Sequence, residues 1–166
     1  MYRVCKLHPT NLAASVAGRK PWELTYREPT LRVRRGEQVL LCGPGSMRAW
    51  PVAAVAVAVS TTRVAMANFE SAMASELRAL LPDERAAVNA LVDKWSCPTK
   101  ARPRTYMYLT HFSAVHSLQR PVDLHDEQLG VRPPYHRACS ALPVLPGSLD
   151  ILQSHLYRAG VGADAR

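Results

Sequence analysis

The sequence predicts an α+β fold, a small β-barrel of about five to six strands with flanking and inserted helices. Three observations carry this prediction. Alternating or β-branched runs recur over the first 60 residues, apolar residues take a helical period between residues 69 and 95, and another strand-like run follows at 105–110. With 166 residues and 48% apolar composition, the chain is long enough for one domain with an ordinary core.

Four strands and one helix are expected within the first 60 residues. Alternation from Tyr2 to Leu7 predicts the first strand, and a short helix follows with Thr10 or Asn11 as its N-cap and Gly18 at its left-handed end. Alternation or β-branched content predicts three further strands. They cover residues 23–27, residues 38–42 after a basic turn at Gly36, and the Val-rich residues 51–60, which form a central strand.

A change of period marks the helical part of the chain. Apolar residues recur at helical spacing in two stretches and predict a helical hairpin around Pro82 and Asp83. The stripes are Phe69, Met73, Leu77, Leu80 and Leu81 in the first helix and Val88, Leu91, Val92 and Trp95 in the second. Beyond them the sequence predicts a strand at 105–110, one helical turn at 113–118 and a last helix at 149–159.

All of these elements are assigned to one compact unit. Residues 1–130 form the barrel domain, with the helices at about 69–95 as an insertion. Residues 131–166 form a Pro-rich extension that ends in a helix and packs on the same domain.

Charge and cysteine usage restrict the classes of partner. The chain carries 21 Lys and Arg residues against 13 Asp and Glu, a net charge of +8. A basic chain favours polyanions such as nucleic acid, although a basic surface also keeps a protein in solution. The four cysteines lack metal-ligand spacing, so we expect no metal, no cofactor and no disulfide, as in a reducing compartment. Neither a signal peptide nor a membrane-spanning run is recognised, which predicts an intracellular protein, cytoplasmic or nuclear, without a membrane partner.

The stretch from Gly18 to Glu23 groups residues that could form a site. A Lys beside a carboxylate can position a phosphate or take part in proton transfer, and Lys20 and Glu23 lie three residues apart. The alternative interpretation is a surface ion pair of little energetic value. Trp22, in a turn after a proline, is a candidate for stacking on a base.

Other basic and aromatic residues are candidates for the same kind of contact. Because Arg side chains bind phosphate and aromatic or His side chains contact bases, they extend the candidate nucleic-acid site. These residues are Arg34, Arg35, Arg48, Tyr108 and His111. A solvated loop is an equally good interpretation for each of the arginines alone.

The stretch GRKPWE resembles the G-x-K-x-x-E signature of ASCH domains, a branch of the PUA-like superfamily. Gly18, Lys20 and Glu23 stand at its three positions. The short helix before it, the RRGEQVLL turn and strand after it, and the Val-rich strand at 51–60 follow the family's order. The later run YMYLTHFSAVHSLQRPV is similar to the family's closing strand, so the resemblance covers roughly residues 2–122.

One position of the signature departs from the family. The usual Arg two residues after the Glu is Thr25 here, and Arg27, on the same strand face, could substitute for it. The resemblance implies a β-barrel with a cleft beside the motif and a role connected with RNA, through binding, cleavage or removal of the acetyl group from acetylcytidine. The acetylcytidine amidohydrolases match this chain at Lys20 but carry a Thr nucleophile where it has Glu23, so their mechanism does not transfer as written. Their downstream catalytic Glu would fall near Glu76 or, as the alternative, near Glu70.

Three functions follow from these residues. The leading hypothesis is an RNA-binding domain in which Lys20 and Arg27 contact phosphate, Trp22 stacks on a base or lines the cleft, and Glu23 accepts from a base edge or orients Lys20. The second is a metal-independent ribonuclease or amidohydrolase that uses Lys20, Glu23 and Glu76 in the same cleft. The third is a protein-interaction module built on the helical hairpin and the Pro-rich extension.

Overall fold

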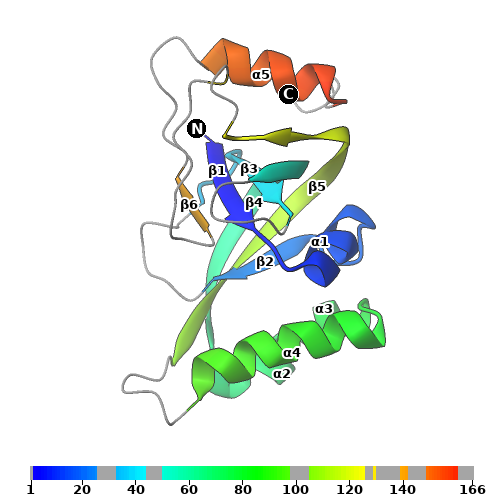
Figure 1. Cartoon of the computed structure of the whole chain (residues 1–166). Helices are drawn as coiled ribbons and strands as arrows, with labels where there is room; N and C mark the ends of the chain where they lie inside the picture. The colour runs from blue at the N-terminus through cyan, green and yellow to red at the C-terminus, as the bar shows by residue number, and fades with distance from the viewer. Residues whose placement is uncertain are drawn as a thin grey trace.

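Six strands form one mixed sheet in the computed structural model, which describes residues 2–25, 33–43, 50–97, 105–125, 129, 139–141 and 149–160. The strand order is β2-β5-β4-β3-β1-β6 (Figure 1). β1 and β3 run parallel, and the other neighbouring strands run antiparallel. The strands are β1 (Tyr2–Lys6), β2 (Trp22–Thr25), β3 (Gln38–Cys42), β4 (Pro51–Ala65), β5 (Tyr106–Asp123) and β6 (Cys139–Ala141).

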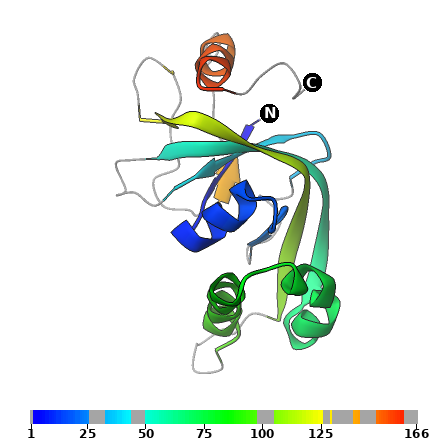
Figure 2. The ribbon, with the colours of Figure 1, turned by 90° about the vertical axis from the view of Figure 1, so that its right-hand side faces the viewer.

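Helices cover the two ends of this sheet. They are α1 (Pro9–Val16), the 3-10 turn η1 (Met66–Asn68), α2 (Phe69–Ala72), α3 (Ala74–Arg78), α4 (Pro82–Ser96) and α5 (Leu149–Arg158). In both views α5 lies at the end where β5 finishes, and α2, α3 and α4 lie at the end where it begins (Figures 1 and 2). This arrangement confirms the predicted α+β class. Across the described parts of the chain, no helix combines the length and apolar content needed to cross a bilayer.

The sheet curls on itself without closing into the predicted barrel. Glu23 and Thr25 of the edge strand β2 line the same small cavity as Cys5 of β1 and Val39 of β3, which lie towards the other edge. Within the described ranges, β2 pairs with β5 alone and β6 with β1 alone, so the sheet stays open between them.

The curvature of the sheet arises in its two longest strands, β4 and β5. β4 has 15 residues and β5 has 18, and the register between them shifts before Ala54 and on both sides of Ala58. Such bulges bend a strand and increase its twist. The helical turn predicted at 113–118 is wrong, because this segment continues β5 and pairs with β4, as Val115 does with Ala56. Pairing with a long Val-rich strand overrides the local preference there.

The first helix ends as predicted but begins two or three residues earlier than the predicted N-cap, Thr10 or Asn11, implies. His8 is its N-cap and Pro9 its first residue, so Thr10 and Asn11 lie inside the first turn and no side chain caps the helix. A proline is tolerated at this position because the first N–H groups of a helix have no intrahelical partner. Gly18 takes a φ of 75°, which confirms the predicted left-handed helix end.

The inserted helices pack through the stripes that the sequence predicted. Their buried residues join Trp22 and Leu24 of β2 and Met107 and Leu109 of β5 in one core cluster. The helical members of this cluster are Ala14, Phe69, Met73, Leu77, Leu80, Val88, Val92 and Trp95. Leu81, at the junction to α4, is exposed instead. The helices therefore cover one face of β2 and β5.

Two elements from residues 131–166 pack on this same sheet. β6 pairs with β1, and α5 buries Leu152 and Leu156 in a cluster that also contains Leu118 of β5. The chain then turns at Gly160, whose φ is 112°. A side chain there would place its Cβ 2.9 Å from Gln119 Cγ, so the close approach of α5 to β5 requires glycine.

An ion pair ties the turn after α1 to the start of α4. Arg19 Nε donates to both carboxylate oxygens of Glu84 at 3.1 Å, and Leu81 N donates to Glu84 Oε2 at 2.9 Å. The hydrogen bond from Arg19 holds the pKa of Glu84 below its usual value. The pair thus joins the GxKxxE segment to the helical insertion.

We expect Glu84→Gln to lower the melting temperature at neutral pH, because the variant loses the charge that Arg19 binds. A carboxyl group with a lowered folded-state pKa stabilises the fold above its ordinary pKa, and this stabilisation is lost as the pH falls through the lowered value. The difference between wild type and E84Q should therefore shrink on acidification. Thermal unfolding followed by circular dichroism measures it, and a difference that does not change with pH would contradict the assignment.

Candidate nucleic-acid interface

Lys20 and Glu23 form a buried ion pair at the start of β2. Lys20 Nζ lies 2.6 Å from Glu23 Oε2 and donates to Trp22 O at 3.0 Å, and Leu24 N donates to Glu23 Oε1 at 2.9 Å. Lys20 is 1% exposed and Glu23 is 5% exposed. The alternative of a surface ion pair is therefore wrong: the pairing is real, but it is buried.

The position of Lys20 follows from the direction of the backbone carbonyls in β2. Pro21 O accepts from Phe112 N and so points towards β5. Carbonyls alternate along a strand, so Trp22 O points to the open edge of the sheet, where Lys20 Nζ donates to it. The same ammonium group lies 4.3 Å from the centroid of the Trp22 ring. Lys20 thus covers the open edge of β2 and holds Glu23 at the same time.

Burial changes the roles expected for two residues of the motif. Lys20, with its ammonium group bound to Glu23 and Trp22 O, is too deeply buried in this state to contact a phosphate. Trp22 lies on the helix-covered face of β2 and is 1% exposed, so its ring packs in the core rather than stacking on a base. The prediction of a Trp22 stacking contact is wrong because α2–α4 cover this face.

The opposite face of β2, β5 and β4 carries two rows of polar and aromatic side chains. The strand registers align Glu23 with Thr110 and Thr61, and a Thr61 Oγ1 to Thr110 Oγ1 hydrogen bond of 3.1 Å joins two of them. The next row aligns Thr25 with Tyr108 and Arg63. Paired residues on adjacent strands place their side chains on the same face. We call this the inner face, because it lines the curl of the sheet.

The inner face ends in an exposed group of basic and aromatic residues, which we call the mouth. The Arg63 guanidinium carbon lies 3.6 Å from the centroid of the Tyr106 ring, and Tyr106 is 43% exposed. Arg34 and Arg35 are exposed on the neighbouring turn, which is joined to β4 by the hydrogen bond from Thr61 Oγ1 to Val33 O. The mouth consists of Thr25, Arg34, Arg35, Arg63 and Tyr106.

The cavity behind the mouth is small. It measures about 10 Å³ and is lined by Cys5, Glu23, Thr25, Val33, Val39, Thr110 and Phe112. A volume of this size holds about one water molecule. A base therefore does not fit inside the curl in this state, and a larger ligand would contact the exposed mouth.

His111 and Glu76 lie together on the helix-covered side. His111 pairs with Trp22 in the strand register and so faces α2–α4 rather than the inner face. Its Nε2 lies 3.5 Å from Glu76 Oε1, and the two side chains are 34% and 26% exposed. The structure brings these two predicted residues together but separates them by the thickness of the sheet from Thr110 and the mouth.

The remaining predicted residues divide into three groups. Tyr108 lies on the inner face, and Arg34 and Arg35 belong to the mouth. Arg27 and Arg48 lie outside the described residues. Arg63 and Thr61 were missed, although the alternation of the STTRVA segment after residue 60 continues that of the strand before it. In the described ranges no three His, Cys, Asp or Glu side chains are grouped so that they could hold a metal ion.

Comparisons with known proteins give one result, a shared fold. No protein-family model matches the chain, and no curated protein matches it in sequence. The crystal structure of ASCH from Zymomonas mobilis has a TM-score of 0.61 and 17% identity, over 93% of this chain and 94% of that one. A tyrosine-to-phenylalanine variant and a serine-to-alanine variant of that protein give TM-scores of 0.62 at 17% identity, over 93% of this chain and 97% and 95% of theirs. The chain therefore has the ASCH fold, which confirms the resemblance at the level of the fold.

Proposed function

We propose that this ASCH-fold chain binds single-stranded RNA at the mouth. The observation that carries the proposal is the exposed stack of Arg63 on Tyr106, with Arg34 and Arg35 exposed on the turn that is hydrogen-bonded to the same strand β4 at Ala58 and Thr61. An exposed aromatic ring flanked by guanidinium groups suits a strand whose bases are unpaired, since bases stack on rings and phosphates bind Arg. The net charge of +8 supports the same class of ligand.

Each residue of the mouth has a distinct role in this proposal. Tyr106 and the planar Arg63 group provide the surface on which a base stacks. Arg34 and Arg35, on the turn bonded to Ala58 of β4, neutralise phosphates further along the bound strand. Lys20 and Glu23 support the site indirectly. Their ion pair fixes the open edge of β2 and so keeps Thr25 aligned with Tyr108 of β5.

Replacing Tyr106 with Ser is expected to weaken RNA binding by about 1–3 kcal/mol, the usual contribution of one stacked base. Tyr157 on α5 is also an exposed tyrosine, and it lies at the opposite end of the molecule, so Tyr157→Ser is the matched control (Figure 1). Fluorescence anisotropy with labelled single-stranded RNA and the matching DNA at low salt measures both variants. Absence of binding by the wild-type protein to either strand would refute the proposed function, and equal losses in the two variants would refute the place of the site.

The His111–Glu76 pair supports a second candidate function, RNA cleavage. A carboxylate 3.5 Å from the imidazole can orient it for proton transfer. His111 would take the proton from a ribose 2′-hydroxyl, whose oxygen attacks the adjacent phosphorus. The 5′ oxygen of the next nucleotide would leave and take a proton from water, which gives a 2′,3′-cyclic phosphate and a 5′-hydroxyl end.

Product analysis tests this candidate directly. Labelled RNA is incubated with wild type, His111→Gln and Glu76→Gln, with and without EDTA. Cyclic-phosphate ends that form with wild type and disappear in H111Q would support cleavage by this pair. RNA that stays intact with the wild-type protein would refute it. Because the pair lies on the face of β5 opposite to the mouth, H111Q should keep its affinity for RNA.

A further inference from the structure

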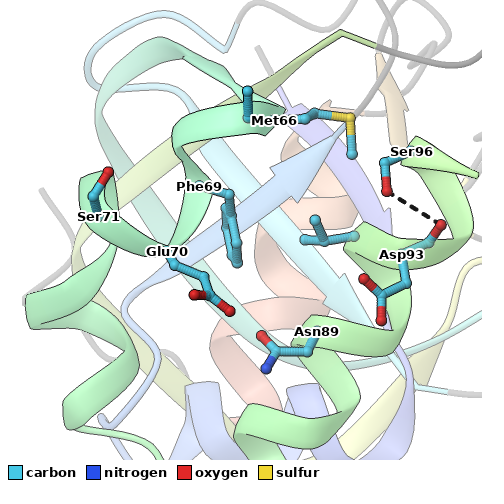
Figure 3. Close-up of a pocket in the computed structure, with 9 residues that line it drawn as sticks. Met66, Phe69, Glu70, Ser71, Asn89, Asp93 and Ser96 are labelled. Carbon is cyan, nitrogen blue, oxygen red and sulfur yellow. Dashed lines mark hydrogen bonds between the residues drawn. The ribbon is translucent and has the colours of Figure 1, made fainter.

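A second hollow lies in the helical insertion, apart from the inner face. It is a pocket of about 530 Å³ between the η1–α2 segment and α4 (Figure 3). A pocket of this volume is in the range that holds small organic ligands. Its lining residues are Met66, Ala67, Phe69, Glu70, Ser71, Asn89, Val92, Asp93 and Ser96. We call it the helical pocket.

The helical pocket combines an apolar floor with an acidic rim. Phe69 and Val92 are buried core residues and form the floor, with Met66 beside them (Figure 3). Glu70 on α2 and Asp93 on α4 are exposed and line the pocket from its two walls. Among the described lining residues there is no Lys, Arg or His, and neither carboxylate forms an ion pair with another described residue. The rim is therefore negative in a protein whose net charge is +8.

The side-chain hydroxyl groups of the pocket are already used as donors. Ser71 Oγ donates to Asn68 O at 3.0 Å, and Ser96 Oγ donates to Asp93 O at 3.3 Å. The oxygen atoms of these two side chains can still accept hydrogen bonds. Asn89 Oδ1 is buried without a hydrogen-bond partner, which is an unusual state for a polar atom. Two carboxylates, two hydroxyl oxygens and this amide oxygen make the pocket a set of acceptors.

From this lining we infer that the helical pocket binds a small organic ammonium ion that carries an apolar body. The ammonium group would donate hydrogen bonds to the carboxylates of Glu70 and Asp93 and to Asn89 Oδ1, which are acceptors in the pocket lining. The apolar body would lie on Phe69 and Val92, and the ring of Phe69 adds a cation–π attraction. A bare metal ion does not fit as well, because only two of the lining side chains are carboxylates and the floor is apolar.

This inference does not depend on RNA binding. The mouth presents arginines and a tyrosine on the inner face, whereas the helical pocket presents carboxylates in the inserted helices. The two sites would select ligands of opposite charge. Their tests are therefore separate, and loss of one function leaves the other measurable.

Binding of benzylammonium, compared with benzyl alcohol, tests the charge requirement. The two probes share an aromatic body and differ in the ammonium group, so isothermal titration calorimetry at millimolar concentrations isolates the role of the rim. We expect the wild-type protein to bind benzylammonium and to bind benzyl alcohol at least roughly tenfold more weakly. Failure of benzylammonium to bind, or equal affinity for the two probes, would overturn the proposal.

A pair of variants tests the location. Glu70→Gln combined with Asp93→Asn removes both charges while keeping the shape of the side chains, and should weaken benzylammonium binding roughly tenfold or more. The matched control, Asp83→Asn combined with Asp150→Asn, removes the same number of charges from exposed positions outside the pocket. All four residues are exposed, so each double variant should keep the wild-type melting temperature. If the pocket double variant melts at a lower temperature, the single variants E70Q and D93N replace it in the binding experiment. Equal affinity in the pocket variant and the control would overturn the proposal.

Discussion

Replacing Lys20 with Met is expected to lower the free energy of unfolding by about 3–5 kcal/mol, the cost of leaving a buried charge without its partner. Lys20 is 1% exposed, and its ammonium group is the partner of the equally enclosed Glu23 carboxylate. Met keeps most of the side-chain length but removes the charge, the hydrogen bond to Trp22 O and the contact with the indole ring. Urea unfolding followed by tryptophan fluorescence and circular dichroism measures the change.

A double-mutant cycle separates loss of the pair from loss of packing. Glu23→Gln alone leaves Lys20 charged and buried, so it should also be strongly destabilising. The combined variant Lys20→Met with Glu23→Gln buries no charge and should be less destabilised than the sum of the two single variants. Additive losses, or a Lys20→Met variant within about 1 kcal/mol of wild type, would show that the pair is exposed to solvent in solution.

The strands that the sequence predicted best are those with a strong local signal. Residues 38–42 form β3 at the predicted bounds, because a short apolar run lies between a glycine turn and another glycine. β2 was predicted at 23–27 and begins one residue earlier, at Trp22. The alternation within it was correct, since Glu23 and Thr25 line one cavity while Leu24 joins the core on the other face.

The environment of Trp22 could not be predicted from its neighbours in sequence. An indole after a proline and between charged residues is typical of an exposed turn. The ring is buried because Phe69, Met73 and Val88 of the inserted helices pack in the same cluster. Those residues lie more than 40 positions away along the chain, and only the tertiary structure specifies which face of β2 they cover.

The mouth was only half predicted for a similar reason. Of the mouth residues, Arg34 and Arg35 were candidates from the sequence, whereas Tyr106 and Arg63 were not, and Arg63 lies three residues beyond the predicted end of the Val-rich strand at residue 60. β4 continues to Ala65 because β5 pairs with it along this whole length, residue by residue, from Ser60 onwards. A strand that owes its length to a partner rather than to its own residues is difficult to recognise locally. Arg63 therefore reaches Tyr106 through a pairing that links positions more than 40 residues apart.

Replacing both Arg34 and Arg35 with Gln is expected to make RNA binding weaker and less dependent on salt. Each phosphate contact on a single strand contributes about −0.7 to the slope of log affinity against log salt, so loss of two contacts should make the slope shallower by about 1.4. Both side chains are exposed on a turn whose fold depends on backbone hydrogen bonds, namely Glu37 N to Arg34 O and Gly36 N to Ala58 O. The substitutions should therefore leave the melting temperature unchanged.

The control for this prediction must remove the same charge from another place. Arg120 near the far end of β5 and Arg158 on α5 are exposed and lie at the end of the molecule opposite to Tyr106 (Figure 1). If the mouth binds RNA, Arg120→Gln with Arg158→Gln should change the slope much less than the Arg34 and Arg35 pair does. If the net charge of +8 attracts RNA without a defined site, the two double variants should give the same slope and the same loss of affinity. Anisotropy titrations across a series of salt concentrations decide between a located interface and a diffuse electrostatic attraction, because only a located interface makes the two variants differ.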